Sequence, residues 1–169
     1  MRQIDVDPPL MPGSLGTGPF PRRRRSDELL LCDLMRLAVC QVKAGQWVHE
    51  YADRSQVQTF ALEMAQAHAN LVEELRVLAV HCQLLLLDEA AAQAAEGKSA
   101  LQELNHAALE QSYLRQHGVV DHESMMKTLE ILSQDSSNTA IRNFSLTLQP
   151  LVRVFHQSGL RLYSMYSKE

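Results

Sequence analysis

The chain has 169 residues, of which 46% are hydrophobic and only 5% are aromatic, and its net charge is -4. This length is typical of one domain, and a composition rich in Leu, Ala, Gln and Glu favours helices over sheets. The mild net negative charge argues against binding of nucleic acid over the whole protein surface, so no nucleic-acid partner is expected.

Residues 1–25 differ in composition from the rest of the chain. They hold five of the six prolines and three of the seven glycines, and they end in the basic run Arg22–Arg25. We expect a disordered tail. The arginines are either a solvated charge cluster or a contact for an acidic partner.

No stretch of the sequence resembles a leader or a membrane span. The start lacks an apolar core, and no apolar run approaches the ~20 residues that a spanning helix needs. We therefore expect no transmembrane segment. The chain as written is predicted to be cytoplasmic, and it would be periplasmic if a leader is missing from it.

Four long stretches carry apolar residues at three- and four-residue steps, which is the pattern of an amphipathic helix. Ser26 is a suitable N-cap for the first helix. Pro150 lies inside the fourth and should kink it. An Ala-rich stretch between the second and third helices allows a short extra helix that breaks at Gly97. The four helices are predicted at about 26–52, 55–86, 105–133 and 139–166.

Four such helices with one longer middle connection predict an all-α fold. We expect residues 26–169 to form one antiparallel four-helix bundle of the ferritin-like kind.

Histidines interrupt the apolar stripes of three predicted helices. His68 lies in the seam of the second helix, His122 lies in that of the third, and His156 flanks that of the fourth. One interpretation is structural: a neutral core imidazole bonded to a carbonyl or side chain of a neighbouring helix. The other is a metal site, since three imidazoles can hold zinc or copper.

The sequence resembles a bacterial domain-of-unknown-function family of ferritin-like four-helix proteins, many of them described as exported or outer-membrane proteins. The stretch AGQWVHEYADRSQVQTFALEMAQAHANLVEELRVLA, residues 44–79, carries most of the resemblance. SYLRQHGVVDHE and LQPLVRVFH look like the family's later motifs. The family's first motif is matched by Gly45, Val57, Phe60, Ala61, Met64, His68 and Leu75.

The resemblance implies a fold and places His68, His122 and His156 in the family's histidine positions, but it implies no activity. The chain departs from the family pattern at several points. Gln41 stands where the family often has Glu, and Ala67 stands where it often has Asp. The spacings from Tyr113 to His122 and from Pro150 to His156 are one residue longer than usual.

A carboxylate-bridged di-iron centre does not fit this sequence. Such a centre needs a Glu-x-x-His motif from each of two helices. The fourth helix has no Asp or Glu between Asp135 and Glu169. Glu63 and His68 are five residues apart, which places them on different faces of the second helix.

Two further groups of residues allow other chemistry. The three cysteines, Cys32, Cys40 and Cys82, are expected to be free thiols, although Cys40 could meet Cys82 across a helix pair. A polar row on the third helix could bind metal or shuttle protons, but it is interpreted as a solvated face. That row consists of His106, Glu110, Tyr113, His117 and Asp121.

Taken together, the residues predict a protein that is not an enzyme. The first hypothesis is a helical bundle that acts as an interaction or stress-associated protein without a cofactor, and that binds a protein partner or forms a homodimer. The alternative is a divergent bundle that binds zinc or copper through His68, His122 and His156. A third hypothesis is a redox-sensitive protein that uses Cys40 or Cys82.

Overall fold

The computed structural model describes residues 26–86 and 100–167, and these residues form helices and short connections without any strand. The third predicted helix is one continuous run of three segments, in which a π-helix separates two α-helices. The elements are α1 (Asp27–Tyr51), α2 (Ser55–Cys82), α4 (His106–Tyr113), the π-helix η1 (Leu114–Val120), α5 (Asp121–Asp135) and α6 (Thr139–Tyr166).

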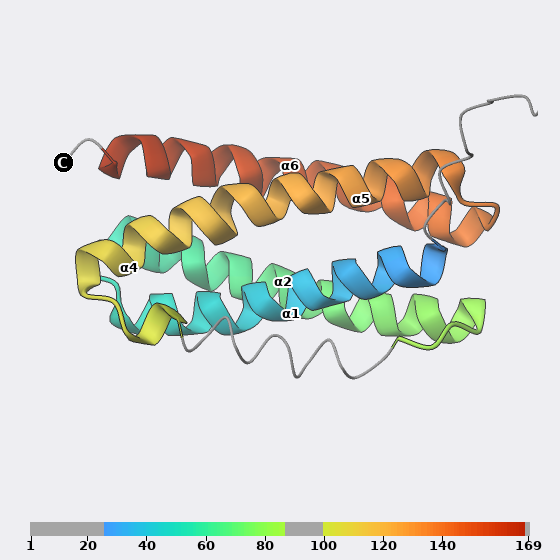
Figure 1. Cartoon of the computed structure of the whole chain (residues 1–169), viewed down its shortest axis with the longest axis horizontal. Helices are drawn as coiled ribbons and strands as arrows, with labels where there is room; N and C mark the ends of the chain where they lie inside the picture. The colour runs from blue at the N-terminus through green and yellow to red at the C-terminus, as the bar shows by residue number, and fades with distance from the viewer. Residues whose placement is uncertain (1–25, 87–99, 168–169) are drawn as a thin grey trace, which may run out of the picture.

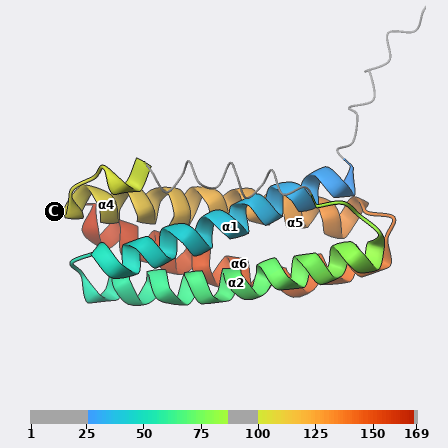
Figure 2. The same ribbon diagram turned by 90° about the horizontal axis from the view of Figure 1, so that it is seen from below.

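The helices form two antiparallel hairpins that pack together as a bundle. The α1–α2 hairpin lies against the hairpin that α5 makes with α6 (Figures 1 and 2). α4 begins at the opposite end of the bundle from the end of α2, so α2 and α5 run in the same direction. The predicted all-α four-helix fold is confirmed.

The helix boundaries agree closely with the predicted ones, and the caps explain most of them. The hydroxyl of Ser26 accepts a hydrogen bond from the Leu29 amide, and the side chain of Asn138 caps α6 in the same way. The prediction of a second helix to residue 86 was wrong. α2 ends at Cys82 because Gln83 adopts the left-handed conformation, with φ of 56°, which closes a helix even where apolar residues follow.

Some predictions fall partly or wholly outside the described residues. These are the tail with Arg22–Arg25 and most of the Ala-rich stretch around Gly97.

Pro150 lies inside α6, and the helix continues on both sides of it. Within residues 26–86 and 100–167, no helix combines the length and the hydrophobicity needed to span a membrane.

The apolar core consists of two clusters, one toward each end of the bundle. The first joins the start of α1 to the end of α2, most of α5 and the first half of α6. The second joins the end of α1 to the start of α2, α4, the start of η1 and the second half of α6. The middle of the bundle, between the two clusters, contains the buried polar side chains described below.

Two glycines allow η1 and α6 to touch along their backbones. A Cβ atom built on Gly159 would lie 2.5 Å from the carbonyl oxygen of Gly118, and one built on Gly118 would lie 3.2 Å from the Cα of Gly159. The Gly159 contact leaves no room for a methyl group, because backbone atoms cannot move aside as a flexible side chain can. The Gly118 contact is tight and would require its neighbour to shift by a few tenths of an ångström.

We therefore predict that Gly159→Ala destabilises the protein by about 1–3 kcal/mol, even though alanine is the better helix former. Urea unfolding followed by circular dichroism measures the change. Ser164→Ala, at an exposed position of the same helix, is the matched control and should be neutral or stabilising. A Gly159→Ala variant as stable as the parent would show that the helices do not cross this closely.

The π-helix adds one residue to the helical run between Tyr113 and His122. Hydrogen bonds in a π-helix span five residues instead of four, so such a segment takes up one extra residue without ending the helix. At its end, the Asp121 amide bonds to the Gln116 carbonyl, five residues back. Tyr113 before η1 and His122 after it are both fully buried. The extra residue is absorbed while both side chains stay in the core.

Candidate functional site

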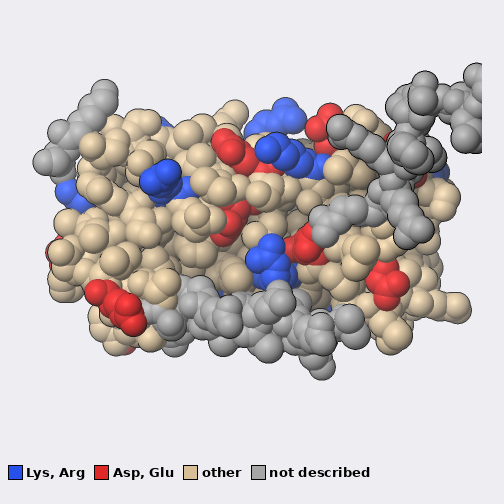
Figure 3. Space-filling view, viewed as in Figure 1, with Lys and Arg blue, Asp and Glu red and all other residues tan. Residues whose placement is uncertain are grey.

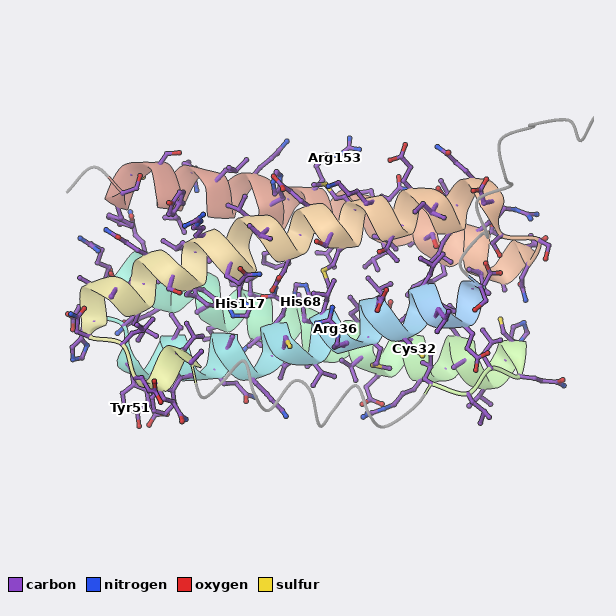
Figure 4. The ribbon with its side chains drawn as sticks, in the orientation of Figure 1. Cys32, Arg36, Tyr51, His68, His117 and Arg153 are labelled. Carbon is purple, nitrogen blue, oxygen red and sulfur yellow. The ribbon has the colours of Figure 1, made fainter. Side chains whose placement is uncertain are left out.

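A layer of buried polar side chains crosses the middle of the bundle. Figure 4 labels two of its members, His68 and His117, in the middle part of the bundle. The layer draws on α1, α2, η1 and α5. Its members are Gln41, His68, His117, Asp121 and His122, each of which is buried.

His68 and His122 contact each other at the centre of this layer. Their ring centroids are 5.3 Å apart and the ring planes are nearly perpendicular, at 89°. Phe155 of α6 packs against both rings, with centroid distances of 5.6 Å and 6.0 Å. One side of the pair is therefore covered by an aromatic ring.

The backbone fixes which nitrogen of each ring carries the proton. Nδ1 of His68 lies 2.8 Å from the Met64 carbonyl oxygen, and Nδ1 of His122 lies 2.7 Å from that of His117. A carbonyl can only accept a hydrogen bond, so Nδ1 must be the donor in both rings. In a neutral ring this leaves Nε2 without a proton. Nε2 of His122 is buried and has no hydrogen-bond partner among the described residues.

Burial keeps both rings neutral at physiological pH. Loss of solvent lowers the pKa of His68 to about 4, against a smaller upward effect of the Met64 carbonyl. Burial also lowers the pKa of His122 to about 3, and the neighbouring His68 lowers it further. Neutral imidazoles with an unprotonated Nε2 are the form in which histidine binds a metal ion.

The third predicted histidine does not join this pair directly. Nε2 of His156 lies 3.5 Å from Oε1 of Glu123, whose side chain is 48% exposed, while that of His156 is 15% exposed. The structure thus brings His68 and His122 into ring contact. Nε2 of His156 is also buried and makes no hydrogen bond among the described residues. Among the described residues, no group of three or more His, Cys, Asp or Glu side chains is arranged to hold a metal ion.

The side-chain amide of Gln41, on α1, holds the carbonyl group that binds the His122 ring. Nε2 of Gln41 donates to the His117 carbonyl at 3.1 Å and to Oδ2 of Asp121 at 3.2 Å. The His117 carbonyl therefore accepts from both Gln41 and the His122 ring. This amide therefore fixes the carbonyl that orients His122.

Asp121 is held in place by its neighbours in the layer. Its Oδ1 accepts a hydrogen bond from the Gln116 side chain at 2.8 Å, and its Oδ2 lies 2.9 Å from Nδ1 of His117. With Gln41 on the same Oδ2, both carboxylate oxygens are engaged by protein groups. Both oxygens of Asp121 are thus used in hydrogen bonds within the polar layer.

The prediction of a solvated polar face on the third helix was wrong. Of its five residues only His106 is exposed, and Glu110, Tyr113, His117 and Asp121 are buried. The row turns inward because this segment packs against the ends of α1 and α6.

Sequence reasoning missed the role of Glu110. Its Oε1 accepts hydrogen bonds from the amides of Asp53 and Arg54, each at 2.8 Å, and its Oε2 lies 2.7 Å from the Arg54 guanidinium. Arg54 is the N-cap residue of α2 and makes no side-chain cap of its own. Glu110 therefore caps the start of α2 from another helix, and its hydrogen bonds attach the α1–α2 turn to α4.

The three cysteines are free thiols, as expected. Burial and the nearby Asp121 carboxylate raise the pKa of Cys40, which disfavours the reactive thiolate. Cys82, the last residue of α2, contacts Asn138, the N-cap residue of α6, at one end of the bundle and away from the histidine layer in its middle. These positions give no support to thiol chemistry at the candidate site.

Comparison with known families identifies the sequence. The model of the family called Domain of unknown function (DUF4142) matches residues 17–161, which is most of the chain. The chain belongs to the DUF4142 family. The predicted family resemblance is confirmed. Among curated proteins and solved structures, none matches the chain significantly. Membership of DUF4142 brings no established activity with it.

Proposed function

We propose that this DUF4142 protein is a non-enzymatic binding bundle whose interior pair, His68 and His122, holds a transition-metal ion of the zinc or copper type. The observation that carries the proposal is the unprotonated, buried Nε2 of His122 beside a second imidazole in the same tautomer. A buried polar atom without a partner is costly, by about 1–3 kcal/mol. An ion bound at that nitrogen removes the cost.

The spacing of the two rings suits a shared ion. An imidazole bound end-on at about 2.0–2.1 Å has its centroid about 3.2 Å from the metal, so two rings at a tetrahedral angle are about 5.2 Å apart. The centroids of His68 and His122 are 5.3 Å apart.

The groups around the pair match those that surround metal-binding histidines. Such histidines nearly always donate their other ring N–H to a carbonyl or carboxylate, which fixes the tautomer and the ring orientation. His68 and His122 both donate to backbone carbonyls. The π-helix provides one of these carbonyls, and π-helical segments are frequent at functional sites.

The pair is buried and is not placed to act on a larger substrate. A surface groove of about 650 Å³ is lined by residues of α4, η1 and α6, and another of about 480 Å³ by residues of α2 and α6. Neither groove is lined by His68 or His122, and Phe155 packs against both rings. This favours binding over catalysis.

The test is the metal content of protein purified without an affinity tag, before and after addition of zinc or copper. We expect about one ion per chain in the parent and none in His68→Asn or His122→Asn. Asparagine keeps a donor near the position of Nδ1 and lacks Nε2, so these variants should fold. Circular dichroism checks this. His81→Asn, at an exposed site, is the control and should bind like the parent. A parent without metal, or variants that bind as well as the parent, would disprove the proposal.

A second candidate function, contact with a protein partner or a second copy, is favoured by exposed apolar residues. Val77 and Val80 on α2 are 71% and 80% exposed, and Leu146 and Val154 on α6 are 56% and 58% exposed. Acidic and basic side chains alternate over the face in Figure 3 without a continuous basic patch, so that face offers no surface typical of nucleic-acid binding. A stress-associated role remains part of this hypothesis.

Sedimentation equilibrium tests whether a second copy covers the apolar residues. For a homodimer we expect Val77→Asp/Val80→Asp to shift the protein to monomer without loss of helix, because a buried charge opposes association. The pair Glu73→Asp/Glu74→Asp, at exposed positions of the same helix, is the control. A parent that is monomeric at every concentration would leave only a different protein as the partner.

A further inference from the structure

We propose that the chain's own N-terminal segment, residues 4–10 with the sequence IDVDPPL, docks in a groove along α5 and α6. The segment lies outside the described residues, whereas every residue of the groove lies within them. The docking is independent of the proposed metal site, and it gives part of the exposed apolar surface of α6 an occupant.

The α5–α6 groove consists of two adjoining hollows. One of about 460 Å³ lies between α5 and α6, and the other, of about 330 Å³, continues along α6 as far as Gln157. Leu146, Gln149 and Arg153 line both hollows. Leu146 and Val154 are 56% and 58% exposed, so the groove offers apolar area that the described residues leave uncovered.

The segment carries side chains that match this lining. Its first four residues alternate between apolar and acidic, and Pro8 favours an extended backbone in the residue before it. Neighbouring side chains of an extended chain point to opposite faces, so Ile4 and Val6 share one face and Asp5 and Asp7 share the other. The apolar face can cover the exposed aliphatic side chains of the groove, which leaves the carboxylates for a cation at its edge.

Charge favours this groove over the exposed apolar residues of α2. Arg153, which Figure 4 labels on α6, can pair with the carboxylates of the segment, since a guanidinium binds a carboxylate in a fixed geometry. Glu130 lines only the hollow nearer α5, so we expect the carboxylates at the other one. Val77 on α2 is 71% exposed, but Glu74 lies one helical turn before it and repels an acidic segment.

The point at which the tail joins the bundle places the segment within reach of the groove. The Ser136 hydroxyl donates a hydrogen bond to Oδ2 of Asp27 at 2.6 Å, so the start of α1 lies beside the end of α5. Gln134, in the last turn of α5, lines the groove. Residues 11–25 can span about 50 Å when extended, whereas the groove follows α6 for about 17 Å. Such a tether raises the effective concentration of the segment to about mM, so a weak contact is enough.

Photo-crosslinking in the full chain tests the docking. p-Benzoylphenylalanine in place of Val154 should crosslink to residues 4–10 of the same chain. A mixture of light and nitrogen-15-labelled chains, analysed by mass spectrometry, separates this product from a crosslink between two copies. The same group in place of Val77 is the matched control, and it should give at least about 10-fold less of the product because the tether alone does not hold the segment there.

Charge reversal tests the role of Arg153. Arg153→Glu should lower the yield from position 154 several-fold, and Asp5→Lys/Asp7→Lys in the same chain should restore it. Circular dichroism shows whether these exposed changes keep the helices. Equal yields from positions 154 and 77, or no crosslink to residues 4–10, would overturn the docking. Crosslinks only between light and labelled chains would overturn it as well and would assign the groove to a second copy.

Discussion

Acidification from about pH 6.5 to pH 4.5 should strongly destabilise the metal-free protein, through the two buried histidines. Their pKa values in the folded state are lowered to about 4 and about 3, against 6.5 for an exposed histidine. Between these values the unfolded chain binds more protons than the folded one, so stability is complete above pH 6.5 and falls as the pH decreases. Each histidine contributes about 1.4 kcal/mol per pH unit over this window. The sum is several kcal/mol, which is a large part of a typical domain's stability.

Urea unfolding at a series of pH values measures this dependence. The double variant His68→Asn/His122→Asn removes both buried imidazoles and should show a much flatter profile. His81→Asn is exposed and should keep the steep one. Equal slopes in the parent and the double variant would show that neither imidazole is excluded from solvent.

Replacement of Glu110 by alanine should be the most damaging single change, at about 3–5 kcal/mol. The carboxylate is 1% exposed and accepts hydrogen bonds from two backbone amides and the Arg54 guanidinium. Its loss leaves the partly buried Arg54 guanidinium and the backbone amides at the start of α2 without their acceptor. Removing one partner of a buried ion pair lowers the free energy of unfolding by far more than the intact pair contributes to it. Arg54 also packs over the ring of Tyr166, 4.3 Å from its centroid, so the end of α6 should loosen as well.

Thermal and urea unfolding measure the loss of stability, and amide exchange at Asp53 and Arg54 localises it. Glu110→Gln keeps the shape and two of the acceptor contacts, so its effect should be intermediate. Glu74→Ala, at an exposed position of α2, is the control and should stay within a few tenths of a kcal/mol. A tolerated Glu110→Ala would mean that α2 is capped by another group.

The fold could be predicted because its determinants are local and periodic. Apolar spacing marked the four helices, and Ser26 and Asn138 supplied caps that the sequence displays directly. The end of α2 was misplaced because its left-handed closing residue is Gln83, which carries none of the signal that a glycine gives. The π-helix could not be read from periodicity, since its five-residue hydrogen bonds do not follow the helical period used to find it.

The candidate site was predicted in part, because histidines in an apolar stripe are visible whereas their mutual distance is not. Periodicity put His68 and His122 on inward faces, but only the folded bundle shows that their rings touch. The sequence suggested a bond from His68 to a neighbouring helix, whereas the ring is held by the Met64 carbonyl of its own helix. Gln41 and Glu110 act through contacts 76 and 57 residues away in the chain, and no local pattern encodes such distances.

The central claim is that His68 and His122 present unprotonated Nε2 atoms to one ion. Nitrogen-15 NMR of the histidine rings in metal-free protein at neutral pH, repeated after addition of one equivalent of zinc or, anaerobically, of copper(I), tests it most directly. The account predicts that both rings carry the proton on Nδ1, and that the Nε2 resonances of these two rings alone shift on addition of the ion. Rings protonated on Nε2, or Nε2 resonances that do not respond to the metal, would contradict it.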